Sequence, residues 1–143
     1  MSDRFQRGHA ESHPAPVRET VSTDQAPRAM GPYSQGIRAG DFLFTAGQAG
    51  VDPATGKLVE GGIEAQTRRT LRNIEAILGA AGTSLDRVVK SGVFLREIGD
   101  FKAMNAVYAE FFPADGKPPA RTTVQVAGLP GGALVEIDVV ALL

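Results

Sequence analysis

The chain has 143 residues, enough for one domain with a single hydrophobic core but too few for two independent cores. Its 15 basic and 16 acidic residues give a net charge of -1, so no overall field attracts nucleic acid or an anionic membrane. It contains no cysteine, which excludes disulfides, a thiolate nucleophile and a cysteine-based zinc site, and its apolar runs are too short for a transmembrane helix.

Residues 1–23 mix charged, polar and proline residues without apolar periodicity. Such a segment buries too little apolar surface to offset its ordering entropy, so we expect a mobile tail before a single domain at residues 24–143. Both histidines lie in this segment, and we expect no metal centre in the domain. The segment lacks the apolar middle region of a secretory signal, which makes a cytoplasmic location the expectation.

The domain is predicted to begin with a β-hairpin. Ser34–Arg38 and Phe42–Gln48 have the composition of strands, and Ala39-Gly40-Asp41 supplies the turn between them. Residues 52–56 combine a proline that presets one backbone angle with a glycine that accepts a positive φ, so we expect a loop there.

The next segment is predicted to be an amphipathic helix. Between Ile63 and Ala81 apolar residues recur at spacings of three and four, and charged residues occupy the other face. Gly82 follows directly, where a glycine in the left-handed conformation commonly ends a helix.

The remaining chain adds one helix and three strands. A third strand is predicted within Asp86–Arg96, and a second helix follows, capped by Asp100 and stopped by Pro113. The last two strands are predicted at 121–127 and 133–142. The order is ββαβαββ, which predicts an α+β fold with two helices on one face of a sheet.

Apolar residues occupy both alternations of two predicted strands. Leu43 alternates with Phe42 and Phe44, and in the third strand Val89, Val93 and Leu95 alternate with Val88 and Phe94. Two helices cover only one face, so we expect a symmetric homo-oligomer to cover the other and to form ligand clefts between subunits. The alternative is a flat apolar face trimmed by loops.

The C-terminal segment places Arg121 directly after Pro-Pro-Ala and Glu136 inside a β-rich apolar run. A guanidinium matches a carboxylate bidentately, and a partly desolvated carboxyl group is suited to proton transfer. Together they predict a site for a small carboxylic acid. Alternatively, Arg121 is a solvated surface charge and Glu136 an outward-facing strand residue that shares its alternation with Asp138, a surface carboxylate.

Four separated segments resemble the RidA/YjgF family of reactive-intermediate deaminases, in the family's order and spacing: APRAMGPYSQGIRAGDFLFTAGQ, ILGAAGTSLDRVVKSGVFL, DFKAMNAVYAEFF and PPARTTVQVAGLPGGALVEID. The resemblance runs from about Ala26 to the C-terminus. It implies a chorismate-mutase-like α+β fold and a homotrimer with clefts at subunit interfaces. It also implies hydrolysis, without a cofactor, of enamines and imines such as 2-aminoacrylate and 2-iminopropionate to a 2-keto acid and ammonia.

The resemblance also implies roles for individual residues. Arg121 resembles the arginine that holds the substrate carboxylate, and Glu136 the glutamate that orients or activates water. Tyr33 resembles the tyrosine lining the cleft, and Asn105 matches a polar position near the site. From the residues alone, Tyr33 could instead be a core ring and Asn105 could simply bond a loop.

The chain departs from well-known members of this family at two positions. Thr123 stands where many have a reactive cysteine, and Ala46 stands where others have serine. Thr123 is either a substrate-binding residue or a strand residue of no special role. Both changes concern substrate range, because neither removes the carboxylate anchor or the acid/base group.

Other functions fit the same residues. The cleft could hold a small carboxylate such as 2-ketobutyrate as a sensor without turnover, or the enzyme could hydrolyse another specialised metabolite. The ribonuclease activity attributed to some family members finds no histidine in the predicted domain and no basic patch with interleaved aromatics. We therefore expect a small-molecule ligand, with neither nucleic acid nor membrane as a partner.

Overall fold

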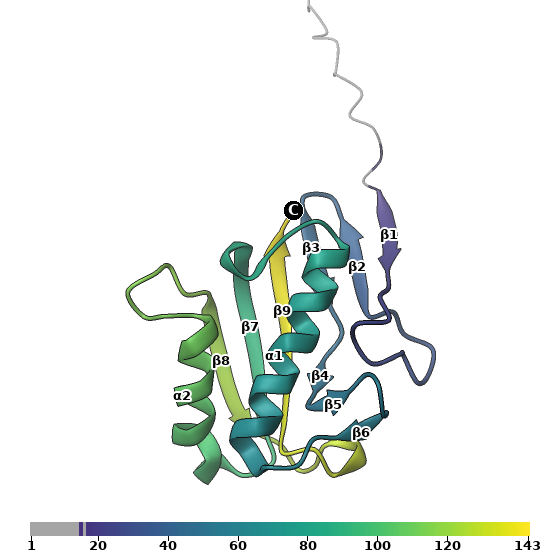
Figure 1. Cartoon of the computed structure of the whole chain (residues 1–143). Coiled ribbons are helices and arrows are strands. Elements are labelled where there is room, and N and C mark those ends of the chain that lie inside the picture. Colours follow the sequence, from purple (N-terminus) through teal and green to yellow (C-terminus); the bar gives the residue numbers. More distant parts are fainter. Residues whose placement is uncertain (1–14, 16) are drawn as a thin grey trace, which may run out of the picture.

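The computed structural model describes residue 15 and residues 17–143, which form a mixed main sheet with two helices on one of its faces and a separate two-stranded sheet of β5 and β6 (Figure 1). The strands of the main sheet lie in the order β1-β2-β3-β9-β7-β8, and β4 also pairs with β9. The strands and helices are β1 (Arg18–Val21), β2 (Gly36–Ala39), β3 (Phe42–Thr45), β4 (Gln48–Ala49), β5 (Val51–Asp52), β6 (Lys57–Leu58), α1 (Gly62–Ala80), β7 (Val88–Leu95), α2 (Phe101–Phe111), β8 (Ala120–Gln125) and β9 (Val135–Leu142).

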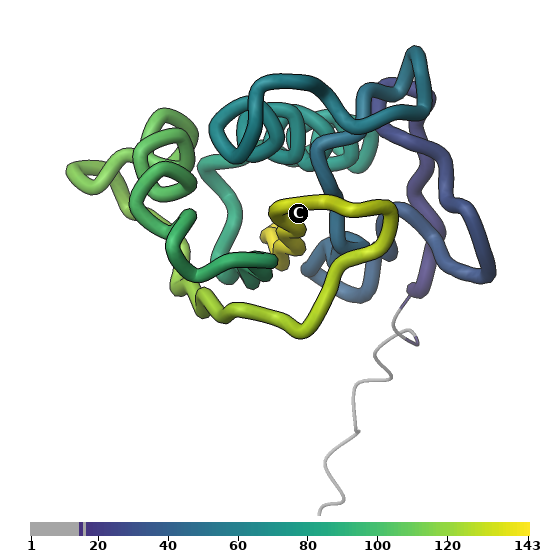
Figure 2. Tube along the Cα trace, turned by 90° about the horizontal axis from the view of Figure 1, so that it is seen from below, coloured from purple at the N-terminus to yellow at the C-terminus, as the bar shows by residue number. Residues whose placement is uncertain are grey.

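Strand order is decided by the two helical crossovers. Neighbours in the main sheet pair antiparallel, except that β7 and β8 are parallel and are connected through α2. The C-terminal strand β9 lies in the middle of the sheet, between β3 and β7. Seen along the strands, both helices lie on the same side of β9 (Figure 2). The predicted α+β architecture with two helices on one face is confirmed.

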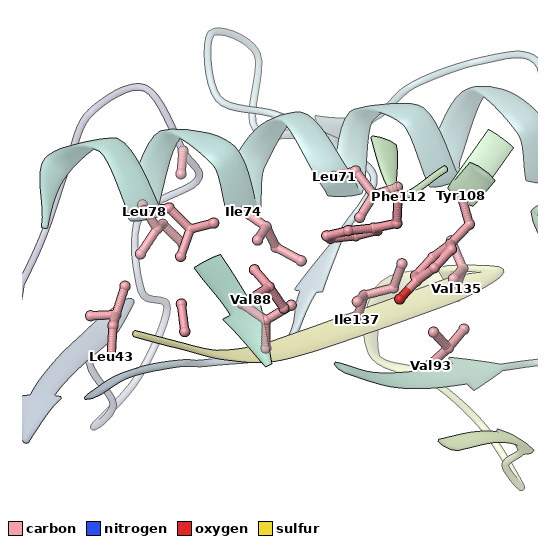
Figure 3. Close-up of a cluster of buried hydrophobic side chains, with 14 of the residues drawn as sticks. Leu43, Leu71, Ile74, Leu78, Val88, Val93, Tyr108, Phe112, Val135 and Ile137 are labelled. Carbon is pink, nitrogen blue, oxygen red and sulfur yellow. The ribbon is translucent and has the colours of Figure 1, made fainter. Parts of the chain in front are cut away.

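The core lies between α1, the end of α2 and the inner face of the sheet (Figure 3). Leu71, Ile74, Ile77 and Leu78 of α1 are fully buried, as the predicted spacing required. The helix ends as expected, because Gly82 has φ of 84° and Thr83 N–H donates to Leu78 O at 2.9 Å. No helix in residues 17–143 is long and apolar enough to cross a membrane.

Asp100 does not cap α2 as predicted. A short 3-10 turn, Ile98–Asp100, precedes the helix, and Asp100 already has helical angles with φ of -83° and ψ of -1°. An N-cap residue needs extended angles to turn its side chain toward the first free N–H groups, so the Asp100 carboxylate makes no capping bond. The helix ends at Phe111, two residues before Pro113.

The predicted strand boundaries change at two places. The tail prediction is wrong for Arg18–Val21, which form the edge strand β1 on β2, while residues 1–14 and 16 lie outside the described residues. The single strand predicted at Phe42–Gln48 is two strands, because the chain bends at Ala46 and Gly47 between β3 and β4. Backbone hydrogen bonds to β2 stabilise β1 although its apolar pattern is weak, and such hydrogen bonds leave no periodic signal in the sequence.

The predicted alternation of β7 is also corrected. A bulge between Val88 and Lys90 shifts the register on β9, so that Val88 is buried with Val93 and Leu95 while Val89 is exposed. An extra residue in one strand reverses the side on which the preceding side chains lie.

The sheet face opposite the helices, here called the open face, carries large apolar side chains. Phe42 and Phe44 of β3 are 39% and 45% exposed, and their neighbour Leu43 is fully buried. Val124 of β8 and Leu142 of β9 are also exposed. The prediction of a second apolar face is confirmed for β3, and what covers it stays a prediction.

Candidate functional site

A cavity of about 630 Å³ lies where residues 27–33, the β3–β4 bend and the start of β9 meet. Its wall is mostly apolar, and the one acidic side chain in it is that of Glu136. The other lining residues are Pro27, Arg28, Met30, Tyr33, Ala46, Gly47, Gln48, Ala49, Val51, Gly56, Pro130 and Gly131.

Glu136 enters the cavity because of its place on β9. Val135 and Ile137 are buried in the core, so the alternation of the strand turns Glu136 to the opposite face, where it is half-buried. Its carboxyl group lies against the backbone of Gly47, where an added Cβ would be 2.7 Å from Glu136 Cδ. Burial raises the pKa of Glu136, and the negative charge of Asp138 raises it further.

Asp138 is not the plain surface carboxylate that the sequence predicts. It is half-buried two residues after Glu136, and burial raises its pKa. Hydrogen bonds from the backbone N–H groups of Gly92 and Asp138, together with the positive charge of Lys90, oppose this rise.

Tyr33 lines the same cavity from its outer side. Its side chain is 52% exposed, which contradicts the alternative of a core ring. Its hydroxyl oxygen accepts a hydrogen bond from the Met30 N–H at 3.0 Å, so the ring closes the 30–33 turn. We call Tyr33, Glu136 and the Gly47 backbone the acid half-site.

Arg121 lies elsewhere, on edge strand β8 beneath α2. Its guanidinium carbon is 4.6 Å from the centroid of the Tyr108 ring and 5.6 Å from that of Phe101. The side chain is half-buried, and the salt bridges within the described chain join other residues, Arg68 with Glu110 and Arg72 with Glu75. Aromatic rings thus stabilise the Arg121 cation, and no acidic side chain of residues 17–143 forms a salt bridge with it.

Asn105 and Thr123 lie on α2 and β8, the same two elements that hold Arg121 and its aromatic contacts. Asn105 lies between Phe101 and Tyr108 on the same stripe of α2, and Thr123 follows Arg121 by two residues on β8, on the same alternation. Both are half-buried. We call Arg121, Asn105 and Thr123 the anchor half-site.

The two half-sites do not meet within one chain. Arg121 pairs with Ser91 and Glu136 with Phe94 on the intervening strand β7, an odd offset that sends the two side chains to opposite faces. Strand spacing and rise per residue put their Cα atoms about 14 Å apart. A single copy therefore does not bring Arg121 and Glu136 together, and a site between subunits that contains both stays a prediction.

Sequence reasoning missed three residues that shape these half-sites. Gly47 accommodates the Glu136 carboxyl group. The Tyr108 ring lies against the Arg121 guanidinium, and Ser91 hydrogen-bonds the Tyr108 hydroxyl. Tyr108 lies seven residues after Phe101, and this helical spacing was the available signal. Gly47 had no local signal, because its neighbour Glu136 is distant in sequence.

Comparisons with known proteins agree with this fold. The family model described as Endoribonuclease L-PSP matches residues 23–143. A RutC family protein of Pyrococcus horikoshii is 51% identical over 125 residues, covering 87% of this chain and 98% of that protein. The 2-iminobutanoate/2-iminopropanoate deaminase of Mus musculus is 41% identical over 126 residues, covering 88% of this chain and 92% of its own length.

A solved structure gives the same result. The crystal structure of E. coli TdcF with bound serine matches with a TM-score of 0.82 and 39% identity, covering 87% of this chain and 98% of TdcF. Sequence and structure agree over nearly the same residues. The chain therefore belongs to the Endoribonuclease L-PSP family, which includes the RidA and YjgF proteins that its motifs resemble.

Proposed function

We propose that this protein hydrolyses small enamines and imines, such as 2-aminoacrylate and 2-iminopropionate, to a 2-keto acid and ammonia without a cofactor. The observation that carries the proposal is that one chain holds both a guanidinium lying over an aromatic ring and, on the other face of the sheet, a half-buried carboxyl group of raised pKa. One suits a substrate carboxylate and the other suits proton transfer. The name of the Mus musculus relative, a deaminase of 2-imino acids, supports the same chemistry.

In this mechanism the anchor half-site of one copy faces the acid half-site of another. Arg121 binds the carboxylate bidentately, and Tyr33 borders the space beside the imine carbon. Glu136 accepts a proton from water as the water oxygen bonds to the carbon of the protonated imine, which gives a neutral carbinolamine. The same carboxyl group returns that proton to nitrogen. The C–N bond then breaks as the hydroxyl oxygen forms the C=O bond, and the hydroxyl proton leaves with ammonia as ammonium.

The proposed assembly is a homotrimer. The two half-sites are different surfaces, so their contact is heterologous, and a closed ring of copies gives every half-site a partner. The exposed Phe42 and Phe44 on the open face offer apolar surface for such contacts. Three is the ring size that the family resemblance implies.

Mixing two inactive variants tests the shared site. Arg121→Ala lacks the anchor and Glu136→Gln lacks the base, so each alone should lose keto-acid formation above the uncatalysed rate. After unfolding and refolding together at equal amounts, random rings should regain about one quarter of wild-type activity, because each copy then supplies an intact half-site to some neighbours. The assay generates 2-aminoacrylate by dehydration of serine.

The controls separate the possible outcomes. Each variant refolded alone should stay inactive, and refolded wild type sets the full scale. Full activity of Arg121→Ala alone would overturn the anchor role. Two inactive variants that stay inactive when co-assembled would show that the site is not shared between copies.

Ligand binding without turnover is the competing outcome. A wild-type protein that binds 2-ketobutyrate through Arg121 but hydrolyses no imine in a panel made from several amino acids would be a carboxylate sensor. Ribonuclease activity, which the family description names, is not proposed, since residues 17–143 contain no histidine. Ala46 and Thr123 make a different imine or acylated metabolite the enzymatic alternative.

A further inference from the structure

Three residues of α2 form one stripe that faces β8. Phe101, Asn105 and Tyr108 are spaced by four and three residues, which places them above one another on a helix. Two of the three are aromatic rings, and the Arg121 guanidinium lies within 6 Å of both ring centroids. The polar residue of the stripe, Asn105, lies between the rings.

The stacking contact decides how Arg121 presents its donors. An arginine side chain has many rotamers, and a flexible cation would meet a carboxylate in many orientations. Stacking on a ring, which guanidinium groups favour, leaves the N–H groups in the guanidinium plane free for a carboxylate. The closer ring, that of Tyr108, is the stronger constraint at 4.6 Å.

Tyr108 is itself held in place from two sides. Its hydroxyl is 2.7 Å from Ser91 Oγ, and its ring packs on Phe112 with centroids 4.8 Å apart. Tyr108 is 5% exposed and Ser91 is fully buried. Ser91 is also the β7 partner of Arg121, so backbone pairing, the hydroxyl contact and the ring–cation contact form a closed triangle.

We infer that Tyr108 and Phe101 form an aromatic clamp that orients Arg121 for a substrate carboxylate, with Tyr108 as the principal positioning residue. The inference rests on the proposed function, which supplies the substrate carboxylate. It adds that residues of α2 set the orientation of Arg121. It requires no contact between Tyr108 and the substrate. Removing the ring should weaken carboxylate binding while the acid/base step continues.

Kinetics of matched variants test the clamp. Tyr108→Leu should raise KM about tenfold with kcat changed much less, because the anchor is loosened in the ground state and the transition state alike. Tyr108→Phe keeps the ring and should restore KM to within about twofold of wild type. Ile77→Val trims the core where α1 packs on Gly36 of β2, far from β8 in the sheet, and its KM should stay near the wild-type value.

Two further measurements complete the test: a variant at an exposed position, which should fold normally, and a readout that does not depend on activity. Phe101 is 39% exposed, so Phe101→Leu should fold normally and raise KM about threefold, in keeping with its longer distance. Nitrogen NMR of the Arg121 Nε, assigned with Arg121→Lys, should show slow side-chain rotation in wild type and faster averaging in Tyr108→Leu. Calorimetry with 2-ketobutyrate should show a matching loss of affinity.

The results distinguish failure of the clamp from failure of the proposed function. A wild type that turns over no imine overturns the proposed function, while the NMR and 2-ketobutyrate measurements still test the clamp. Unchanged KM, affinity and Arg121 dynamics in folded Tyr108→Leu and Phe101→Leu would overturn the clamp. A KM increase in Ile77→Val equal to that in Tyr108→Leu would do so as well, because general core packing would then explain it.

Discussion

Glu136 shows how a single position on a strand acquires acid–base character. It shares its alternation with Asp138 while Val135 and Ile137 face the core, so the outward-facing interpretation is correct, and the acid–base role stays a proposal. Burial in the cavity and the neighbouring carboxylate both favour its protonated form. Its activity should therefore depend on pH.

The acid limb of the pH profile should report Glu136. Below the raised pKa the carboxyl group is protonated and cannot accept a proton from water, so kcat/KM should fall as pH falls through that value. Glu136→Gln should lower kcat/KM by about a hundredfold or more, which removes turnover above the uncatalysed rate and with it this limb. Keto-acid formation measured across the acidic and neutral range provides the check.

Asp138→Asn is the matched control for that profile. It removes the nearby negative charge, so the pKa of Glu136 and the acid limb should both move to lower pH while the neutral rate persists. A profile unmoved by Asp138→Asn would contradict the electrostatic coupling, and a wild-type rate in Glu136→Gln would make Glu136 structural.

Among the elements of the fold, the bend between β3 and β4 positions the acid half-site. A single strand was predicted at Phe42–Gln48, where apolar or small residues run from Phe42 to Gly47, and the break at Ala46 and Gly47 is not visible in that pattern. The close approach of Gly47 to Glu136 explains why the chain bends at a residue without a side chain. By contrast, α1 was predicted accurately because nineteen residues give a strong periodic signal.

Gly47→Ala should damage function far more than folding. The new Cβ would overlap the Glu136 carboxyl group and displace it, which should lower kcat/KM about a hundredfold. Gly79→Ala in α1 is the control, since a Cβ there meets nothing within 4 Å and should stabilise the helix slightly without changing activity. Equal activity of both variants would show that the Glu136 position tolerates displacement.

The whole molecule presents two unlike half-sites and one apolar open face. A single copy leaves each half-site without its complement, and it leaves Phe42 and Phe44 exposed. Association of copies would satisfy both conditions at once. Assembly and activity should therefore be lost together.

Phe44→Glu places a charge on the open face, where Phe44 is 45% exposed, and should reduce both oligomer mass in light scattering and deaminase rate. Val17→Glu changes another exposed apolar residue outside the open face and should leave both unchanged. A monomeric Phe44→Glu protein with full activity would contradict a site shared between copies.

The amino-acid sequence by itself determined the α+β class, the two helices, the apolar character of both faces of β3 and the residue types available for chemistry. Only the tertiary structure decided that Arg121 and Glu136, fifteen positions apart, leave the sheet on opposite faces. Periodicity reports which side chains of one element point the same way, but it does not report strand order. That order follows from the crossover through α2, which carries β8 to the sheet edge, and from the insertion of β9 between β3 and β7.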